Sequence, residues 1–313
     1  MPSQQFMNPS HASFFGEALR SSFPLSQGLD PSFERALRFV LGNPGSLIRP
    51  QLVFAMATAY GLGAERAEQL AVALEYFHTA SLLFDDLPCM DDALERRGAA
   101  CAHLIFGEEG AILTALALIN RAYALTWRAV AGCPPAAQPK ILAFVEHCLG
   151  ADGLLNGQSL DLHYATLPHT RETTERIARG KTVSLIRLTL ALPAMLGNAS
   201  ARELQLIERI AVYWGLGYQI LDDLKDVLQD AGQSGKTPAR DATLGRPNLA
   251  TAIGIDAAVE RLTRFIALGG KSLCCLFAMR PGLEFLARLG EQLEEELDRV
   301  TQSVSAQVEE VPA

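Results

Sequence analysis

Two acidic clusters constrain this chain most, because each stands at the end of a long apolar helical pattern. The first is Asp85-Asp86-Leu87-Pro88-Cys89-Met90-Asp91-Asp92, and the second is Asp222-Asp223-Leu224-Lys225-Asp226. Bare carboxylates are costly to bury, so a fold that keeps both clusters must supply cations or water to them. Oxygen ligands of this kind suit Mg²⁺, which often shares its site with substrate phosphates. Two such clusters facing each other could hold a diphosphate between metal ions.

The rest of the chain predicts an all-α fold. Hydrophobic residues make up 49% of the sequence, and they recur with helical spacing and without lasting strand-like alternation. The predicted helices lie at about 30–41, 46–60, 64–86, 109–131, 136–150, 151–164, 171–196, 201–230, 255–270 and 283–304. We expect a loose lead-in with one short helix at 1–24, a flexible loop at 232–238 and a frayed tail at 305–313.

Composition excludes several classes of protein. The net charge of −8 disfavours nucleic acid as a partner. No stretch of about 18 apolar residues runs free of charged or strongly polar residues, so no membrane span is expected. The N-terminus lacks the basic and apolar regions of a secretory signal. The six cysteines show no metal-binding spacing and fit the reduced thiols of a cytoplasmic protein.

The second acidic cluster has a simpler alternative reading. Asp222 and Asp226 stand four residues apart and share a helix face, where like charges destabilise the helix unless a cation or water offsets them. An exposed acidic face without any role would explain this cluster alone. Because the first cluster also ends an apolar helix, we favour a shared role in metal binding over two unrelated acidic faces.

Basic residues follow the first cluster closely. Arg96-Arg97-Gly98 begins four residues after Asp92, and the forked guanidinium group of arginine matches the oxygens of phosphate. Beside four aspartates, this pair predicts the second half of a metal–diphosphate clamp. His78 lies seven residues before Asp85, nearly two helical turns, so both point the same way. A lone helical histidine is more often a packed or surface residue, but the alignment of His78 with the acidic cluster favours a functional role about equally.

The order of these motifs resembles the trans-isoprenyl diphosphate synthase (polyprenyl synthetase) family, in the short-chain bacterial type that includes geranylgeranyl and farnesyl diphosphate synthases. The resemblance covers roughly residues 40–255. The matching segments are Asp85–Asp92 (with a two-residue insertion), Arg96-Arg97-Gly98, His103, Phe106-Gly107-Glu108, Gly157-Gln158-Ser159-Leu160-Asp161, Lys181-Thr182, Tyr218-Gln219, Asp222–Asp226 and Gly235-Lys236. It implies a single isoprenoid synthase domain over 1–313, a bundle of about ten to thirteen helices around a central cavity.

The resemblance also implies the reaction and the role of each residue. An allylic diphosphate would ionise and condense with isopentenyl diphosphate, with about three Mg²⁺ ions in each site. The implied metal ligands are Asp85, Asp91 and Asp222, with Asp86, Asp92, Asp223 and Asp226 as second-tier ligands or supports. The allylic diphosphate would be held by Arg96, Lys181, Lys236 and Arg246. Thr182 and Gln219 would face the developing cation. Isopentenyl diphosphate would be held by Arg49, His78 and Arg97.

One segment departs from the family pattern. The family usually has Gly-Gly-Lys-Arg-Leu-Arg-Pro where this chain has Pro44-Gly45-Ser46-Leu47-Ile48-Arg49-Pro50, so Ser46 stands in place of a diphosphate-binding lysine. A neutral hydroxyl binds an anion more weakly than an ammonium group does, and we expect weakened binding of isopentenyl diphosphate. Arg35 and Arg38 are the nearest candidates in sequence for supplying the missing charge. Arg246, where the family commonly has lysine, keeps its charge.

Small residues before the first cluster bear on product length. Ser81 lies one turn before Asp85, and Ala80 precedes it, so neither blocks a growing hydrocarbon chain early. By resemblance, the lack of a bulky aromatic at Ala80 implies geranylgeranyl diphosphate as product, with farnesyl diphosphate next. Phe77 would be the channel floor or an ordinary core residue. Two alternatives remain open: a terpene cyclase or coupling enzyme with another acceptor, and a non-enzymatic subunit. Family resemblance further suggests a homodimer.

Overall fold

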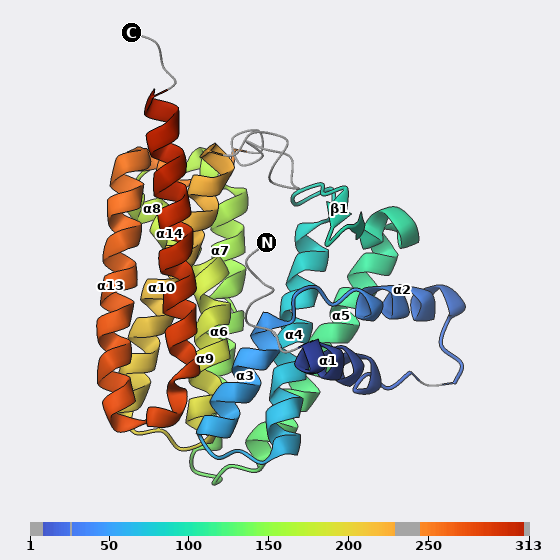
Figure 1. Ribbon diagram of the computed structural model, residues 1–313. Helices are drawn as coiled ribbons and strands as arrows, with labels where there is room; N and C mark the ends of the chain where they lie inside the picture. Colours follow the sequence, from blue (N-terminus) through green and yellow to red (C-terminus); the bar gives the residue numbers. More distant parts are fainter. Residues whose placement is uncertain (1–8, 26, 229–244, 310–313) are drawn as a thin grey trace. The chain divides into compact units, whose positions relative to one another are not determined.

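The structure is a computed structural model, and it describes residues 9–25, 27–228 and 245–309 (Figure 1). The described residues are almost entirely helical, which confirms the all-α prediction. They divide into two compact units. The first unit takes the described residues of 1–142 and 192–198, and the second takes those of 143–191 and 199–313. A single isoprenoid synthase domain over the whole chain stays a prediction.

The first unit is built around α4, whose middle is apolar on every face and therefore buried. It packs against α3 and α5. The helices and strands that lie wholly in this unit are α1 (Pro9–Ser21), α2 (Pro31–Gly42), α3 (Ile48–Ala59), α4 (Ala64–Asp85), β1 (Glu95–Arg96), β2 (Ala99–Ala100) and α5 (Ala102–Ala131). At the start of α2, Asp30 accepts hydrogen bonds from the amides of Ser32 and Phe33, which caps the helix. Pro50 lies in the first turn of α3, as predicted.

The short hairpin β1–β2 was not predicted from the sequence. Glu95 pairs with Ala100 and Arg96 with Ala99, so Arg97 and Gly98 form the turn. Both turn residues have positive φ, 57° for Arg97 and 76° for Gly98, as a type I′ turn requires. Strands of two residues leave no alternating pattern to detect, and Arg-Gly is a weaker turn signal than Asn-Gly.

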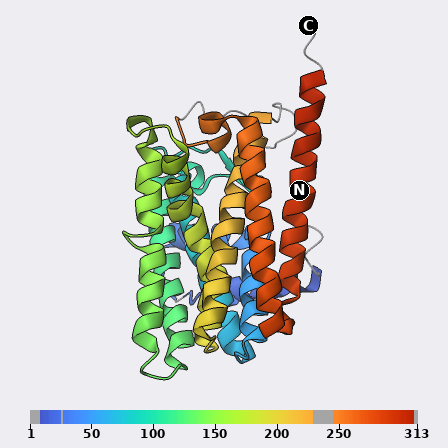
Figure 2. The same ribbon diagram turned by 90° about the vertical axis from the view of Figure 1, so that its left-hand side faces the viewer.

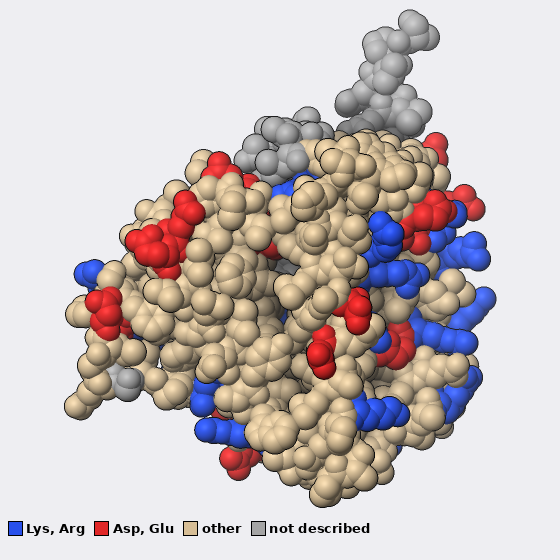
Figure 3. All heavy atoms as spheres, turned by 180° about the vertical axis from the view of Figure 1, so that it is seen from behind, with Lys and Arg blue, Asp and Glu red and all other residues tan. Residues whose placement is uncertain are grey.

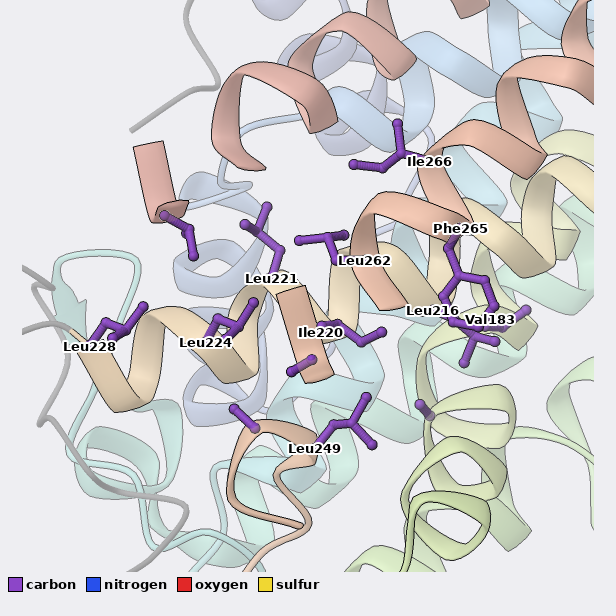
Figure 4. Close-up of a cluster of buried hydrophobic side chains, with 14 residues drawn as sticks. Val183, Leu216, Ile220, Leu221, Leu224, Leu228, Leu249, Leu262, Phe265 and Ile266 are labelled. Atoms are coloured by element: carbon purple, nitrogen blue, oxygen red, sulfur yellow. The ribbon is translucent and has the colours of Figure 1, made fainter. Parts of the chain in front are cut away.

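The second unit is a group of long helices that run side by side, with α10, α13 and α14 in mutual contact (Figures 1 and 2). The core between α10, α12 and α13 contains Leu216, Ile220, Leu224, Leu249 and Leu262 (Figure 4). The elements that lie wholly in this unit are α7 (Leu154–Leu162), η2 (Tyr164–Thr166), α8 (Arg171–Ala178), η3 (Arg179–Val183), α10 (Ala201–Leu228), α12 (Leu249–Ile253), α13 (Ile255–Met279), η4 (Pro281–Leu283) and α14 (Phe285–Glu309). Helices α6 (Gln138–Leu149) and α9 (Ser184–Leu196) each contribute residues to both units.

The helix ends differ from the predicted ranges at several places. Helix α5 begins at Ala102 instead of about 109, across a break at Gly107, whose φ of 78° interrupts the helical backbone. Helix α12 was not predicted, and Asn248 caps it by accepting from the amide of Thr251 at 2.9 Å. Helix α14 continues to Glu309, inside the predicted frayed tail of 305–313. The predicted loop at 232–238 lies outside the described residues.

Two helices, α5 and α13, are long and apolar enough to cross a membrane by length and composition alone. Core helices of proteins in water pass the same test, so this finding is weak evidence for a membrane span. The predicted absence of a span stays a prediction. All six cysteines are free thiols in the structure, which agrees with the interpretation of the cysteine spacing.

Candidate active site

The first acidic cluster folds back on the end of α4. Asp85 is the last residue of the helix, and the amide of Asp91 donates to its carbonyl oxygen at 2.9 Å. Asp92 has a φ of 48°, a left-handed conformation that is uncommon for any residue other than glycine. The turn therefore brings Asp85 and Asp91 together, both half-buried, while Asp92 is exposed.

Asp86 has a different environment from Asp85. Its side chain is 3% exposed, and its Oδ1 accepts from Arg96 Nε at 2.9 Å and from Arg96 Nη2 at 2.6 Å. Two charge-assisted bonds to one arginine offset the cost of burying this carboxylate. Asp86 thus holds the predicted diphosphate ligand Arg96 in place.

Arg97 lies over the loop that carries Ser46. Its Nη1 donates to the carbonyl oxygen of Asn43 at 3.0 Å, and its guanidinium group covers Gly45, where a Cβ atom would collide with it. Its Nη2 lies 3.5 Å from the buried carboxylate of Glu75 on α4. Ser46 itself is exposed. The structure therefore joins Arg97 to the segment in which this chain departs from the family.

His78 and Arg49 belong to the same part of the first unit. Burial lowers the pKa of His78 well below 6.5, and the charges of Arg49, Arg97 and Arg96 lower it further. The imidazole is therefore neutral at physiological pH. The predicted ligands of isopentenyl diphosphate, Arg49, His78 and Arg97, are near enough to one another for these charges to act.

The two arginines proposed from sequence distance to replace the missing lysine are placed elsewhere. Arg38 Nη2 pairs with Glu34 at 2.6 Å on the exposed face of α2. Arg35 is also exposed on that helix. Both are therefore exposed side chains of α2, whereas Arg97 covers Gly45 beside Ser46.

The residues predicted to set product length line α4 below Asp85. Ala80 is fully buried, and Ser81 Oγ donates to the carbonyl oxygen of His78 at 2.8 Å. Phe77 is 5% exposed, and its ring lies edge-on to the ring of Tyr123 from α5, with centroids 4.9 Å apart. The first large side chains below the small residues are thus an aromatic pair from two helices.

The second acidic cluster ends α10 in the second unit. Asp222 is exposed and Asp226 half-buried, whereas Asp223 is 1% exposed. Asp223 Oδ1 accepts from Gln219 Nε2 at 2.9 Å, and its Oδ2 accepts from the amide of Leu249 at 2.8 Å. Asn248 Nδ2 also donates to the Asp223 carbonyl oxygen at 3.0 Å. Asp223 therefore fixes the start of α12 on α10.

The Lys-Thr pair lies in η3, a turn of π-helix between α8 and α9. Such turns are rare and often mark functional sites. Gly157 of α7 and Gly180 of η3 approach so closely that a Cβ atom on Gly180 would lie 2.6 Å from the Gly157 Cα. Thr182 Oγ1 donates to Gln219 Oε1 at 2.7 Å. The π-turn thus brings Thr182 to the same side chain that contacts Asp223.

One carboxylate contacts two of the predicted diphosphate-binding cations. Asp161, which is 6% exposed, accepts from Lys181 Nζ at 2.9 Å, and Arg246 Nη1 lies 3.7 Å from the same oxygen. The fourth predicted cation, Lys236, lies outside the described residues. In the second unit the structure therefore gathers Lys181, Arg246, Thr182 and Gln219 on the elements next to Asp222.

Sequence reasoning named no role for three residues that the structure ties to these cations and helices: Glu75, Asp161 and Asn248. A signal existed for Glu75, because a single glutamate interrupts the apolar run before His78. Asp161 belongs to a segment that matched the family, though without an assigned role. Asn248 gave no signal beyond the preference of asparagine for helix starts.

The carboxylates fit Mg²⁺ chemically. Asp85, Asp91, Asp222 and Asp226 offer hard oxygen donors, and Mg²⁺ takes a few of these while keeping water or phosphate oxygens as its other ligands. Within the described part of the chain, no three His, Cys, Asp or Glu side chains gather so as to bind a metal by themselves.

Known proteins agree with this architecture. Helical structures with acidic motifs that end long apolar helices define the class of the isoprenoid synthases. The geranyltransferase of Helicobacter pylori, solved with magnesium and isoprenyl diphosphate, has a TM-score of 0.76 and 25% identity, covering 94% of this chain and 96% of that one. A farnesyl/geranylfarnesyl diphosphate synthase of Zymomonas mobilis has a TM-score of 0.75 at 24% identity, with 90% and 95% covered. The latter likeness concerns the fold alone.

Sequence comparison identifies the family. The polyprenyl synthetase model matches residues 30–271, and the chain belongs to the polyprenyl synthetase family. The geranylgeranyl diphosphate synthase of Pantoea ananas is 33% identical over 234 residues, which are 74% of this chain and 75% of that protein. The chloroplast geranylgeranyl pyrophosphate synthase of Capsicum annuum is 33% identical over 226 residues, 72% of this chain and 61% of that protein.

Proposed function

We propose that this protein is a trans-prenyltransferase that condenses an allylic diphosphate with isopentenyl diphosphate and makes geranylgeranyl diphosphate. The observation that carries the proposal is the pairing of carboxylates and cations in both units. Asp85 and Asp91 lie at the end of α4 and in the turn that follows it, where Arg96 and Arg97 are also held. Asp222 lies on the helix that contacts Thr182 through Gln219. Relatives named geranylgeranyl diphosphate synthase support the same conclusion.

The first step is the ionisation of the allylic diphosphate. By family resemblance, Asp85, Asp91 and Asp222 would hold about three Mg²⁺ ions, with Asp92 and Asp226 as further ligands, and the metal would supply positive charge to the leaving diphosphate. Asp86 and Asp223 act as supports, because their oxygens accept hydrogen bonds from Arg96, Gln219 and Leu249. The cations that grip the leaving group are Arg96, Lys181 and Arg246, together with Lys236 by family resemblance.

The allylic cation needs a negative electrostatic surface that does not react with it. The Thr182 hydroxyl donates a hydrogen bond to Gln219, so the lone pairs of Thr182 Oγ1 stay available to the allylic cation. Gln219 donates its amide hydrogen to Asp223, which fixes the orientation of its Oε1. Dipoles held in this way stabilise developing charge without reorganising during the reaction.

The second step is the attack of isopentenyl diphosphate. Arg49, Arg97 and neutral His78 hold its diphosphate in the first unit. Its double bond adds to the allylic carbon, and the resulting cation loses a proton to the departed diphosphate. A dry channel is required, because water would capture the cation. Buried Ala80 and the Phe77–Tyr123 pair supply apolar surface for the hydrocarbon.

Incubation with Mg²⁺, labelled isopentenyl diphosphate and a fifteen-carbon allylic primer tests the proposal. We expect mainly twenty-carbon alcohol after dephosphorylation. Ala80→Tyr should shorten the product because it fills the channel early, and Phe77→Ala should lengthen it because it removes the floor. Loss of the primer without incorporated label would overturn the synthase in favour of a cyclase or another acceptor. No turnover of either substrate would favour a non-enzymatic subunit.

The proposal includes a homodimer that forms through α5. Leu113, Leu116, Tyr123 and Trp127 recur on this helix with spacings of three, four and seven, and they are 47–54% exposed. A second copy would cover this apolar stripe. Sedimentation should show a dimer that Trp127→Lys weakens, while Met279→Lys, at an equally exposed position on α13, should leave it intact.

We also propose a cytoplasmic location and no nucleic-acid partner. The net charge is −8, and on the face shown in Figure 3 basic side chains are interspersed with acidic ones and separated by wide uncharged areas. Nucleic-acid binding needs a continuous basic surface.

A further inference from the structure

Glu75 is a buried carboxylate for which the proposed reaction has no role. It is 2% exposed in the middle of α4, and burial raises its pKa above 4.5 against the opposing charges of Arg49 and Arg97. A buried carboxylate is destabilising unless a cation and hydrogen bonds offset its desolvation. An apolar side chain would serve the core better, so the charge of Glu75 calls for an explanation outside core packing.

Its partner Arg97 is held from two further directions. The Asn43 carbonyl oxygen accepts from Arg97 Nη1 at 3.0 Å, and Gly45 leaves the space that the guanidinium group fills. The backbone of Arg97 is left-handed, a conformation that is strained for a residue other than glycine. Three restraints therefore fix this arginine against the turn at Gly45 and Ser46.

We infer that Glu75 is a positioning residue for isopentenyl diphosphate, which holds Arg97 over the Gly45–Ser46 turn so that Arg97 supplies the cation that position 46 lacks. This inference rests on the proposed function, because it assigns Arg97 to isopentenyl diphosphate. Arg49, Arg97 and His78 all lie within electrostatic reach of one another. Without a negative charge beneath them, the two arginines would repel each other and Arg97 would turn toward water.

The contact between Glu75 and Arg97 is looser than that of the neighbouring pair, Asp86 and Arg96, and this suits it to ligand binding. Arg96 makes two bonds of 2.9 and 2.6 Å to Asp86, whereas Arg97 lies 3.5 Å from Glu75. The longer contact orients Arg97 with a weaker ion pair than the one that holds Arg96. A ligand can therefore bind Arg97 without first breaking a strong ion pair.

Calorimetric binding of isopentenyl diphosphate and of inorganic diphosphate, in EDTA and without allylic substrate, tests the inference. We expect Glu75→Gln to weaken both affinities about tenfold, close to 1.4 kcal/mol. In the Arg97→Gln background, Glu75→Gln should have no further effect, because the residue it positions is gone. In turnover assays the KM for isopentenyl diphosphate should rise about tenfold, with kcat and the allylic KM within about threefold.

Glu203→Gln is the matched control, because Glu203 is also a buried carboxylate paired with an arginine, Arg280 at 2.7 Å. It should lower stability and leave diphosphate binding unchanged. Unchanged or tighter binding in Glu75→Gln, or equal weakening with and without Arg97, would overturn the inference. If Glu75→Gln does not fold, Glu75→Asp replaces it: at least threefold weaker binding supports the inference, and wild-type affinity overturns it.

This design separates the inference from the proposed function. A wild-type protein that binds isopentenyl diphosphate but never condenses it would overturn the function and leave the role of Glu75 intact. A wild-type protein with no measurable affinity for either anion would overturn the role of Glu75.

Discussion

The two units hold their predicted diphosphate-binding cations in different ways. In the first unit each arginine of the hairpin has its own carboxylate: Asp86, at the C-terminal cap of α4, for Arg96, and Glu75 of α4 for Arg97. In the second unit one carboxylate, Asp161, contacts both Lys181 and Arg246, which come from different elements. Loss of a carboxylate should therefore disturb one cation in the first unit and two in the second.

This difference suits the two proposed substrates. A carboxylate that contacts two cations holds both of them in one arrangement, whereas a separate carboxylate orients a single cation. The proposed allylic diphosphate accumulates charge as it leaves, so it gains most from such a pair. Isopentenyl diphosphate keeps its charge throughout the reaction and needs only to be bound and oriented.

The largest expected effects come from the two acidic motifs. They should contribute equally to turnover, although the two units hold their diphosphate-binding cations in different ways. Asp85→Asn and Asp222→Asn should each lower turnover at least a hundredfold, about 2.7 kcal/mol of barrier. Each change removes a proposed metal ligand while it keeps the side-chain shape. Circular dichroism should show unchanged helix content. Near wild-type turnover in either variant, at saturating Mg²⁺, would contradict the metal assignment.

The second expected effect tests the shared carboxylate directly. Asp161→Asn should raise the KM for the allylic diphosphate about tenfold, with little change for isopentenyl diphosphate. It should also lower the free energy of unfolding by about 2 kcal/mol, because Lys181 and Arg246 lose their contact with Asp161 together. Glu208→Gln is the control, since Glu208 pairs with Arg187 at 2.7 Å in the same unit. Equal effects on both KM values would show that the units do not divide the substrates.

The third expected effect is smaller and concerns the first unit. Ser46→Lys should lower the KM for isopentenyl diphosphate, by tenfold at most, because Arg97 already lies over the turn. The same change in a Glu75→Gln protein should have a larger effect, since Arg97 is then less well held. Steady-state kinetics of the four proteins measures both values. A gain that is no larger in the Glu75→Gln protein would mean that Arg97 does not compensate for Ser46.

The smallest expected effect concerns the stability of the fold in acid. It compares the contributions of two buried carboxylates, Glu75 in the first unit and Glu203 in the second. Burial opposes ionisation of Glu203, but hydrogen bonds from Arg280 and Ser200 outweigh it and lower the pKa from 4.5 to about 2. Its contribution is therefore present above the unfolded pKa and is lost as the pH falls toward 2. Glu75, whose pKa is raised, acts in the opposite direction, because protonation favours the folded state.

Urea unfolding at about pH 5 and about pH 3 measures both signs. The stability advantage of wild type over Glu203→Gln should shrink by about 1 kcal/mol on acidification, a discounted figure because the Arg280 side chain is 35% exposed. On the same acidification, the free energy of unfolding of wild type should rise relative to that of Glu75→Gln. The same sign for both variants would contradict the environments that the structure gives these carboxylates.

Helical periodicity predicted most of the fold, because apolar spacing along long helices is a local property of the sequence. The hairpin and α12 were missed because their elements are too short for periodicity, and both depend on distant partners. The roles of Asp86 and Asp223 as supports could not be separated from ligand roles, since adjacent aspartates look alike in sequence. Their burial differs only because Arg96 and Leu249, ten and twenty-six residues away, donate to them.

The π-turn of η3 has a consequence for insertions and deletions. A π-turn accommodates one residue more than the same stretch of α-helix, so it can be removed by deleting a single residue. Deletion of Gly180 would restore a regular helix through α8 and α9 and would shift the residues inside the turn, while the helices on either side keep their register. Lys181 and Thr182 would then lose their register with Asp161 and Gln219, although every chemical group of the pair is still present. Related chains that differ in length within this helix should therefore differ in chemistry, even when their lysine and threonine are both retained.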